Sequence, residues 1–424
     1  MHAKMATPTI AIIGTCDTKL QELLYIRDQI RTIHKLNTLL IDVGWNHTEN
    51  NDIDISQRDI VNDPANGADG DNVFDRPRGE YIERMGRYTS KHLQRLVQDG
   101  KIQGAISAGG SGGTALSSAV MQEAFIVGFP KLIVSTIASG DTKDIVGARD
   151  ITLMYSVVDV AGLNGVLRQV LSNAAAAISG MAVAYTHRQN SPSESASSKT
   201  RVGITMFGVT TPGVDAIRKH LESNYPVETY VFHATGTGGK AMEQLVFEKE
   251  LDGLIDFTTT EITDLVMGGV MSAGDGRLDA ASSGIPSIIS LGATDMANFG
   301  ARNTVPDKYK SYKIHEHNPL VTLVRSSAKE TKEISEFFVK KLSNATKPEN
   351  IELWIPKGGV SIISTPGGPF EDSEADKTLF DGIKTGLSSS GIKIIEDERD
   401  VNNKTFAIDV AEALVSKLKL QKSN

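Results

Sequence analysis

The sequence contains little cysteine, few aromatic residues and no excess of basic charge. Its 424 residues include a single cysteine, Cys16, which excludes an intramolecular disulfide and is typical of a reducing compartment. We therefore expect a cytoplasmic protein. Acidic residues outnumber basic ones by 52 to 44, which gives a net charge of −8. This balance disfavours a basic face for a duplex, so no nucleic acid is expected as a partner.

Long uninterrupted apolar runs are missing as well. The first residues, "MHAKMATPTIAIIG", hold no apolar signal core before the first predicted strand. The apolar stretch at residues 157–185 is interrupted by Asp159, Asn164 and Arg168, among other polar residues. A buried helix explains this stretch better than a membrane span, so we predict no contact with a membrane.

The chain divides near residue 195. The segment "HRQNSPSESASSKTR" is rich in serine and has no apolar periodicity, which is typical of a linker. On both sides of it, short apolar runs such as "TIAIIG" and "GLIDFTT" alternate with helical patterns, as expected for parallel sheets covered on both faces. We predict two doubly wound, Rossmann-like α/β domains, residues 1–190 and 201–424, with a linker at 191–200 and an interdomain cleft.

The two halves resemble each other in plan. Each opens with a strand, a turn bearing Thr and Gly, and a helix, as in "IIGTCDTK" and "MFGVTTPG". They are either distant copies of one unit or independent examples of one architecture. Further strands are expected late in the second half, at "TLVRSS", "IELWIP", "SIIST" and "IKIIED".

The strongest local signal for a ligand is "AISAGGSGGTALSS", where an apolar strand ends, a glycine-rich turn follows and a helix begins. The N–H groups at a helix start lack partners and carry partial positive charge, and glycine lets an anion approach them closely. Phosphate is the predicted ligand, and a tight turn without a ligand is the alternative. The residues that would hold it are Gly109, Gly110, Ser111, Gly112, Gly113 and Thr114.

Two more strand-to-helix turns are expected on the same edge of the sheet. In "GTCDTK", Asp17 could cap the helix or meet a metal, whereas Cys16 lacks any indicated base or orienting partner for a nucleophile. In "STIASGDT", the turn follows the next strand. Three polar strand ends on one edge predict a nucleotide pocket, to which these two turns would contribute Gly14, Thr15, Asp17, Thr18, Lys19, Ser139 and Gly140.

A long polar segment at residues 45–80 follows the second predicted strand. A loop of this length is either functional or disordered, so a lid over the pocket is one interpretation. Within it, "DGDNVFD" resembles a calcium loop, but Val73 stands at a ligand position and Phe74 replaces the required glycine. Calcium is therefore not predicted.

The second half carries another glycine-rich turn, "FHATGTGGKAMEQL". It is not a Walker loop, because Ala234 and Ala241 replace the first glycine and the hydroxyl residue that follows the lysine. Its helix start and Lys240 suit a carboxylate or phosphate of a second ligand, and a plain helix start is the alternative.

Polar residues at the other predicted loop ends of the second half could converge on a second substrate, whereas helix caps and solvated turns are the alternative. Two of them are histidines on one strand face, but no third metal ligand is identified, so no metal site is predicted. The residues are Asp256, Glu261, Asp275, Arg277, Asp295, Asn298, His315 and His317.

Taken as an ordered set, these motifs resemble the tomato mosaic virus resistance protein family over residues 10–375. They are "GTCDTK", "DVG" at residues 42–44, "SAGGSGGT", "MYSVVDVAGLN", "ATGTGGKAME", "DFTTTE", "SAGDGRLDAA", "GATDMANFG", "HNPLVTLVR" and "PGGPFED". The resemblance implies two α/β domains, ATP bound in the N-terminal one, and a homodimer. It also implies that plant members bind a viral replication protein, a property that we do not transfer to this chain.

Carried over to this chain, the resemblance assigns the phosphate pocket to the two turns "GTCDTK" and "GGSGGT". Rossmann-like geometry further places Asp42 and Gly44, at the end of the second strand, beside the sugar. We expect a protein that binds ATP and Mg²⁺ together with an unidentified small molecule. Two functions are compatible with this expectation.

The first function is an ATP-dependent enzyme that acts on a carboxylate-bearing substrate. Lys240 and Arg277 would neutralise developing charge, and Asp275 or Glu261 would place magnesium or act as a base. The second function is a nucleotide-gated protein-binding module without turnover. The many polar residues at loop ends favour the enzyme.

Overall fold

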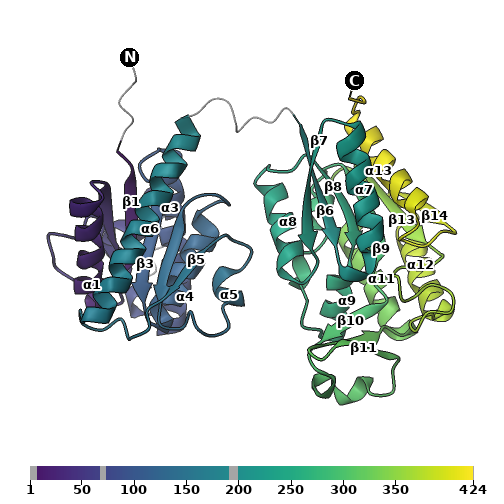
Figure 1. The fold of residues 1–424 in the computed structure, drawn as a ribbon, viewed down its shortest axis with the longest axis horizontal. Coiled ribbons are helices and arrows are strands. Elements are labelled where there is room, and N and C mark those ends of the chain that lie inside the picture. The colour runs from purple at the N-terminus through teal and green to yellow at the C-terminus, as the bar shows by residue number, and fades with distance from the viewer. Residues whose placement is uncertain (1–6, 67–72, 191–198, 424) are drawn as a thin grey trace. The chain divides into compact units, whose positions relative to one another are not determined.

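The structure, a computed structural model, describes residues 7–66, 73–190 and 199–423 in two compact units, Met1–Ala196 and Ser197–Asn424 (Figure 1). Each unit is built on a central parallel sheet, which confirms the predicted fold class. Residues 191–198 of the expected linker and residues 69–72 of the acidic segment lie outside the described residues. The cleft expected between the domains stays a prediction.

Unit 1 contains five parallel strands in the order β2-β1-β3-β4-β5. Alternate residues of each strand enter two separate cores, with Ile10 and Ile12 in one and Ala11 and Ile13 in the other. The sheet is therefore covered on both faces, as its continuous apolar runs predict. The strands are β1 (Thr9–Gly14), β2 (Asn37–Asp42), β3 (Gly104–Gly109), β4 (Lys131–Ser135) and β5 (Thr152–Tyr155).

The helices of unit 1 form a layer on each face of this sheet (Figure 1). Residues of α1 and α6 join one core, and residues of α3 and α4 join the other. The helices are α1 (Cys16–Asp28), η1 (Gln29–Ile33), α2 (Gln57–Val61), η2 (Pro64–Asn66), η3 (Val73–Asp75), α3 (Arg78–Gln98), α4 (Ser111–Ala124), α5 (Lys143–Val146) and α6 (Gly165–Asn190).

Helix α6 is long and apolar enough to cross a membrane by length and composition, and it is the one such helix among the described residues. Its inner face, which includes Leu167, Leu171 and Ile178, is fully buried against Ile106 and Leu132 of the sheet in the same core cluster. This is the packing of a core helix in an α/β domain, as the sequence predicted.

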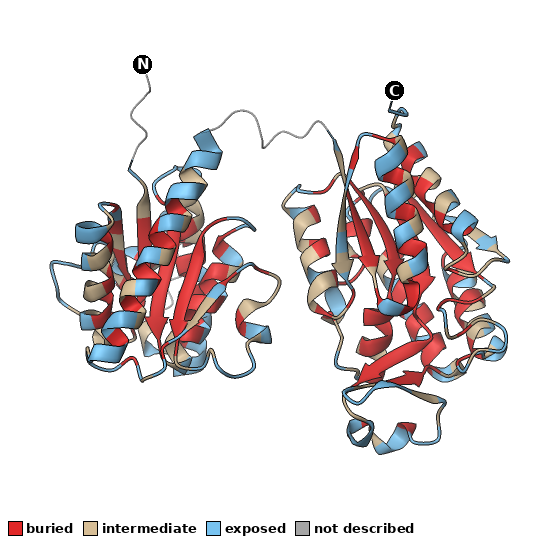
Figure 2. Ribbon diagram, viewed as in Figure 1, coloured by how far each residue is buried: buried red, intermediate tan, exposed pale blue. Residues whose placement is uncertain are grey.

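Unit 2 has six parallel strands in the order β14-β13-β9-β8-β6-β7. Figure 2 shows the same pattern as in unit 1, with buried strands between helices that are exposed on their outer faces. The strands are β6 (Thr200–Met206), β7 (Val227–His233), β8 (Gly253–Thr258), β9 (Ser287–Gly292), β13 (Ile351–Pro356) and β14 (Lys393–Asp397).

The helices of unit 2 range from single turns to helices of 15 residues. They are η4 (Gly208–Thr210), α7 (Thr211–Asn224), α8 (Thr237–Phe247), α9 (Thr260–Met267), η5 (Gly274–Gly276), α10 (Asp279–Ser282), η6 (Arg302–Thr304), η7 (Asp307–Tyr309), α11 (Ala328–Leu342), η8 (Pro348–Asn350), α12 (Ser373–Gly386) and α13 (Lys404–Leu418).

A small antiparallel sheet is inserted after β9. It consists of β10 (Met296–Phe299), β12 (Val321–Arg325) and β11 (Ile314–Asn318), in that spatial order. The predicted strand "TLVRSS" therefore belongs to this sheet rather than to the main one. The predicted strand "SIIST" is wrong, because residues 361–365 form turns. The hydroxyls of Ser361 and Ser364 bond within that loop, which satisfies its polar groups without a neighbouring strand.

Both sheets start with the same strand order. When only the strands of each parallel sheet are numbered, in chain order, both sheets read 2-1-3-4-5, and the sheet of unit 2 adds a sixth strand. In such sheets the connections run in opposite directions from the first and third strands, and ligands bind beyond the carboxyl ends of these strands. This switch point lies at the carboxyl ends of β1 and β3 in unit 1, and of β6 and β8 in unit 2.

Candidate functional site

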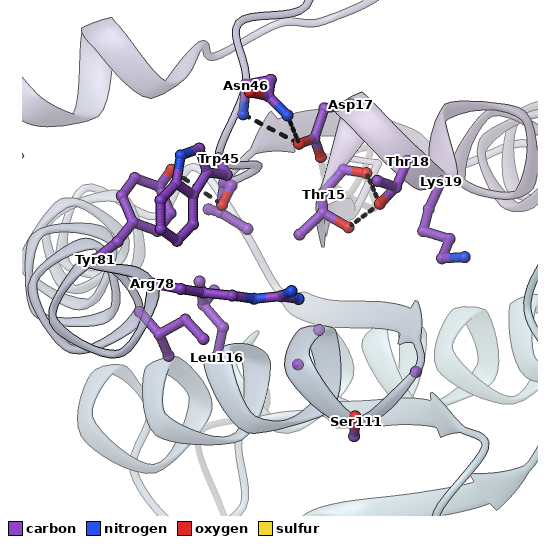
Figure 3. A pocket seen from close by; sticks show the side chains of 15 residues that line it. Thr15, Asp17, Thr18, Lys19, Trp45, Asn46, Arg78, Tyr81, Ser111 and Leu116 are labelled. Carbon is purple, nitrogen blue, oxygen red and sulfur yellow. Dashed lines mark hydrogen bonds between the residues drawn. The ribbon is translucent and has the colours of Figure 1, made fainter. Parts of the chain in front are cut away.

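Unit 1 has a pocket of about 600 Å³ at this point of its sheet (Figure 3). The turns after β1 and β3 form one part of it, and the segment after β2 and the start of α3 form the rest. The lining residues are Thr15, Asp17, Thr18, Lys19, Val43, Trp45, Asn46, Arg78, Tyr81, Ile82, Gly110, Ser111, Gly112, Gly113 and Leu116.

The start of α4 presents free N–H groups to this pocket. Gly110 is the N-cap residue and supplies no side-chain cap. No acceptor within the described residues receives the N–H groups of Ser111, Gly112 and Gly113. A side chain at 112 would crowd the turn, because its Cβ would lie 3.0 Å from Nη2 of Arg78. The glycines thus leave open an approach to a partially positive helix end.

Two cations face the same space. Arg78 is the first residue of α3, and Lys19 lies in α1 at a position where the backbone leaves helical geometry. Within the described residues neither side chain forms an ion pair or a hydrogen bond. Figure 3 shows Arg78 projecting across the pocket between the Thr15–Thr18 turn and Ser111. These two side chains therefore bring positive charge to the pocket that no partner neutralises within the part of the chain that the structure describes.

The carboxylate of Asp42 is buried behind the pocket. Its Oδ1 accepts hydrogen bonds from the N–H groups of Cys16, at 3.0 Å, and of Gly44, at 2.9 Å. Burial raises the pKa of Asp42, and the two N–H donors oppose this rise. Asp42 is 1% exposed and does not line the pocket, so it fixes two of the pocket's walls rather than facing a ligand.

Cys16 is also buried. Burial, together with the negative charge of Asp42, raises the pKa of its thiol well above the ordinary value. A thiol in this state stays protonated at neutral pH, and only the thiolate is a good nucleophile. The structure therefore favours the interpretation of Cys16 as a small buried residue.

Asp17 connects the first turn of α1 to the segment after β2. Its Oδ2 accepts from the backbone N–H of Asn46 at 3.0 Å and from Nδ2 of Asn46 at 3.3 Å. Its Oδ1 is buried and has no hydrogen-bond partner in the described ranges of the chain. Gly44 is required beside it, because a Cβ there would lie 2.5 Å from this oxygen.

The predicted nucleotide residues separate into two groups in the structure. Those that line the pocket are Thr15, Asp17, Thr18, Lys19, Gly110, Ser111, Gly112 and Gly113. Those that do not are Gly14, Asp42, Gly44, Gly109, Thr114, Ser139 and Gly140. Most of the second group support the first: Thr114, for example, bonds through its hydroxyl to Ser135 at 2.7 Å. Ser139 and Gly140 lie in the turn after β4 and are not among the residues that line the pocket.

The sequence analysis missed the aromatic and cationic part of the lining: Val43, Trp45, Asn46, Arg78, Tyr81, Ile82 and Leu116. The available signal was a tryptophan placed directly after a predicted strand, in "DVGWN", in a chain with two tryptophans. Arg78 lies near the end of the segment that was interpreted as a lid, and that interpretation stays a prediction.

In unit 2 two of the predicted residues, Asp256 and Glu261, join Arg277 in a buried cluster that also contains Glu243. The guanidinium is fully buried and pairs with Glu243 at 2.7 Å, Asp256 at 2.7 Å and Glu261 at 2.8 Å. Burial by itself would lower the pKa of Arg277, but the charges of the three carboxylates raise it. The arginine is held charged by its own domain and does not face an open pocket.

Glu261 also binds the backbone of the turn "ATGTGGK", for which a ligand was one of the two predictions. Its Oε1 accepts from the N–H groups of Gly236, at 2.6 Å, and of Gly239, at 3.1 Å. A carboxylate of the protein thus occupies the position at the start of α8 that was predicted for a ligand. In this geometry Glu261 and Arg277 hold the turn in place, and a role for them in chemistry stays a prediction.

The other predicted catalytic residues lie apart from this cluster. Asp275 is exposed and pairs with Lys340 at 3.5 Å and Lys341 at 3.4 Å on α11. Lys240 is exposed on α8. The four residues proposed as catalytic are therefore not brought together around one point.

The remaining polar residues of unit 2 have structural partners. Asp295 is buried and accepts from the hydroxyl of Ser361 at 2.7 Å, and Asn298 donates from Nδ2 to Asp264 at 2.6 Å. His315 and His317 lie on the exposed strand β11. Within the described residues there is no group of three or more His, Cys, Asp or Glu side chains arranged to hold a metal ion.

The fold and the pocket define a class of protein: two doubly wound α/β units, of which the first has a pocket at the switch point of its sheet, lined by the start of α4 and two cationic side chains. The chain belongs to the UPF0261 family, described as an uncharacterised protein family, which the motif resemblance had indicated. Residues 8–187 match the N-terminal domain of this family and residues 199–418 match its C-terminal domain.

Relatives match over nearly the whole chain. A UPF0261 protein of Clostridium tetani is 41% identical over 96% of this chain and 98% of its own length. The ToMV resistance protein Tm-1(GCR237) of Solanum lycopersicum is 38% identical over 89% of this chain, but over 51% of its own length. The tomato relationship confirms the predicted family. Among solved structures, a UDP-N-acetylglucosamine 2-epimerase aligns over 67% of this chain and 79% of its own chain, with 9% sequence identity. The TM-score of this alignment is 0.21, which is too low to carry an argument.

Proposed function

We propose that unit 1 binds ATP through its phosphates, at the start of α4. The observation that carries this proposal is that the N–H groups of Ser111–Gly113 and the side chains of Arg78 and Lys19 share one pocket and have no partner among the described residues. A helix N-terminus favours an anion, and arginine can bond two phosphate oxygens at once. Several positive groups in one pocket fit a polyphosphate better than a single small anion.

Magnesium would enter this site with the ATP. Mg²⁺ is usually held by one or two carboxylates together with phosphate oxygens and water. Among the described residues, Asp17 is the one carboxylate that lines the pocket, and its Oδ1 has no hydrogen-bond partner there. These residues fit a magnesium ion carried by phosphates, with Asp17 as the protein's ligand. The chemistry that Mg²⁺ supplies there is the neutralisation of phosphate charge.

Binding of ATP is measured by calorimetry and by thermal unfolding with magnesium present. ATP at a hundred times its dissociation constant should stabilise unit 1 by about 2.7 kcal/mol. The variant R78Q removes one charged hydrogen-bonding partner and should weaken binding by roughly 10- to 100-fold, since such bonds contribute about 1.5–3 kcal/mol. Arg58, exposed on α2 and outside the pocket, gives the matched control R58Q, which should bind as the native protein does.

A second variant tests the turn itself. Gly112→Val places a side chain 3.0 Å or less from Nη2 of Arg78 and over the free N–H groups, so it should abolish ATP binding while leaving the fold intact. Gly79→Ala, next to Arg78 but with nothing within 4 Å of the added Cβ, is its control and should bind normally. Absence of ATP binding to the folded native protein would refute the proposal.

For the reaction, the enzyme and the binding module remain two proposals with different readouts. Release of ADP or AMP that depends on an added small carboxylic acid would support the ATP-dependent enzyme. Stable ATP binding without release, over a panel of such acids, would support the nucleotide-gated module. The buried state of Arg277 and Glu261 favours the module over the enzyme that the sequence favoured, because neither side chain faces a pocket.

A further inference from the structure

We propose that Trp45 is a platform on which the base of the bound nucleotide stacks, so that this site selects nucleotides over free polyphosphates. The inference rests on the proposed function, because it concerns the same pocket. Its physical basis is the side of the pocket away from the free N–H groups, where the lining changes from polar to apolar with Val43, Trp45, Tyr81, Ile82 and Leu116.

Trp45 has one face covered by protein. Its ring stacks on that of Tyr81, with 5.3 Å between the ring centroids and an angle of 30° between the planes. Tyr81 itself is 2% exposed, whereas Trp45 is half-buried and lines the pocket. The pair thus extends the core of unit 1 up to the pocket and ends there with an indole. An indole at the edge of a pocket offers a flat, polarisable surface to a planar ring.

The segment that carries Trp45 is held by hydrogen bonds on both sides. Asp17 binds the main chain and side chain of Asn46, and Asp42 binds the N–H of Gly44. The hydroxyl of Tyr81 donates to the carbonyl of Gly44, and Nε2 of Gln57 donates to the carbonyl of Asn46 at 2.8 Å. The indole is therefore fixed before a ligand arrives, which reduces the entropy lost on binding.

The pocket has a polar, cationic end and an apolar, aromatic end, as a nucleotide has a charged phosphate end and a planar base. Figure 3 shows Trp45 and Tyr81 on one side and Thr15, Thr18 and Lys19 on the other, with Arg78 reaching between them. Phosphates at the start of α4 and beside Lys19 would leave the base directed at the indole. Asp17 touches both ends, since it lies in the first turn of α1 and fixes the residue after Trp45.

The experiment compares ATP with inorganic tripolyphosphate, each with magnesium, by calorimetry and tryptophan fluorescence. Stacking of one base on an aromatic side chain contributes about 1–3 kcal/mol, so the native protein should bind ATP roughly 5- to 150-fold more tightly than tripolyphosphate. In Trp45→Leu this ratio should fall towards one, while the affinity for tripolyphosphate stays unchanged. ATP, but not tripolyphosphate, should also change the emission of the native protein.

The chain's other tryptophan supplies the control. Trp354 is buried in the core of unit 2, so Trp354→Phe should retain both the affinity ratio and the change in emission. If Trp45→Leu does not fold, the native protein and Trp354→Phe still test the proposal through the emission of Trp45. An unchanged ratio in Trp45→Leu, or no ATP-specific change in emission, would overturn the platform but leave the phosphate site standing. Failure of both ligands to bind would instead refute the proposed function.

Discussion

The two glycine-rich turns of this chain look alike in sequence but differ in what their N–H groups face. "GGSGGT" starts α4 in unit 1, and its N–H groups have no acceptor within the described residues. "GTGGK" starts α8 in unit 2, and two of its N–H groups bond to Glu261. A glycine-rich turn therefore predicts an anion at a helix start, but the rest of the fold decides whether the protein supplies that anion.

The switch points of the two sheets differ in the same way. In unit 1 the point beside β1 and β3 is a pocket, whereas in unit 2 the equivalent point beside β6 and β8 is filled by threonines. Thr210 and Thr258 bond through their hydroxyls at 2.8 Å, and Thr260 donates to the carbonyl of Met296 in β10 at 3.2 Å. Strand β10 of the inserted antiparallel sheet thus contacts the start of α9, the helix that follows β8. The same strand order thus leaves a pocket in unit 1 and a buried cluster of hydrogen-bonded threonines in unit 2.

The largest effect is expected from removing the centre of the unit 2 cluster. Arg277→Leu leaves the carboxylates of Glu243, Asp256 and Glu261 buried without a counter-charge, and breaking a buried pair in this way costs about 3–5 kcal/mol. Urea unfolding followed by the emission of Trp354 measures this loss in unit 2. The affinity of unit 1 for ATP should remain native in the folded fraction.

Arg302 provides the comparison for this variant. It is half-exposed in η6, with Glu316 at 3.8 Å, so Arg302→Leu should change the free energy of unfolding by less than about 0.5 kcal/mol. If Arg277→Leu kept its stability but lost a ligand-dependent activity, the charged cluster of unit 2 would have a functional role rather than a structural one. Arg277 would then regain the catalytic role expected from the sequence.

The sequence predicted the architecture well because parallel strands and amphipathic helices are local patterns. Continuous apolar runs such as "GAISAGG" became β3, and the polar turn after it became the start of α4. The partners of a charge are not local. Glu261 lies 22 residues from Gly239, and Arg78 lies 34 residues before Gly112, so no spacing rule indicates which turn is neutralised and which is left open.

The next largest effect is a pH dependence of the free energy of unfolding that differs between the two units. Burial raises the pKa of Asp264 to about 7 and that of Asp295 to about 6, whereas both carboxyls titrate near 3.9 in an unfolded chain. Between these values the folded state binds more protons than the unfolded state, so unit 2 should become more stable as the pH falls from about 8 to 5. Urea unfolding at several pH values, followed by the emission of Trp354, measures this slope.

Asp264→Asn should flatten this dependence, because the variant side chain has no proton to gain. Each unit of pKa shift corresponds to about 1.4 kcal/mol, so the change should be of the order of a few kcal/mol. In unit 1 burial also raises the pKa of Asp42, but the N–H groups of Gly44 and Cys16 oppose it, and a weaker slope is expected there. A stability of unit 2 that falls or stays constant over this range would contradict the assignment.

The smallest effect is expected at Cys16. At this position of unit 1, as at Glu261 in unit 2, a carboxylate of the protein accepts a hydrogen bond from the start of a helix. The first N–H of α1 already bonds to Asp42, and the thiol is buried beside this carboxylate, which with burial raises the thiol's pKa. Cys16→Ala should therefore leave the affinity for ATP within about twofold and lower the free energy of unfolding by only about 1 kcal/mol. In the native protein, alkylation of Cys16 at pH 8 should be slow and should become fast only on unfolding. Rapid alkylation of the folded protein, or a large loss of ATP affinity in Cys16→Ala, would contradict this prediction. Either result would show that the Cys16 thiol at the start of α1 is accessible from the pocket.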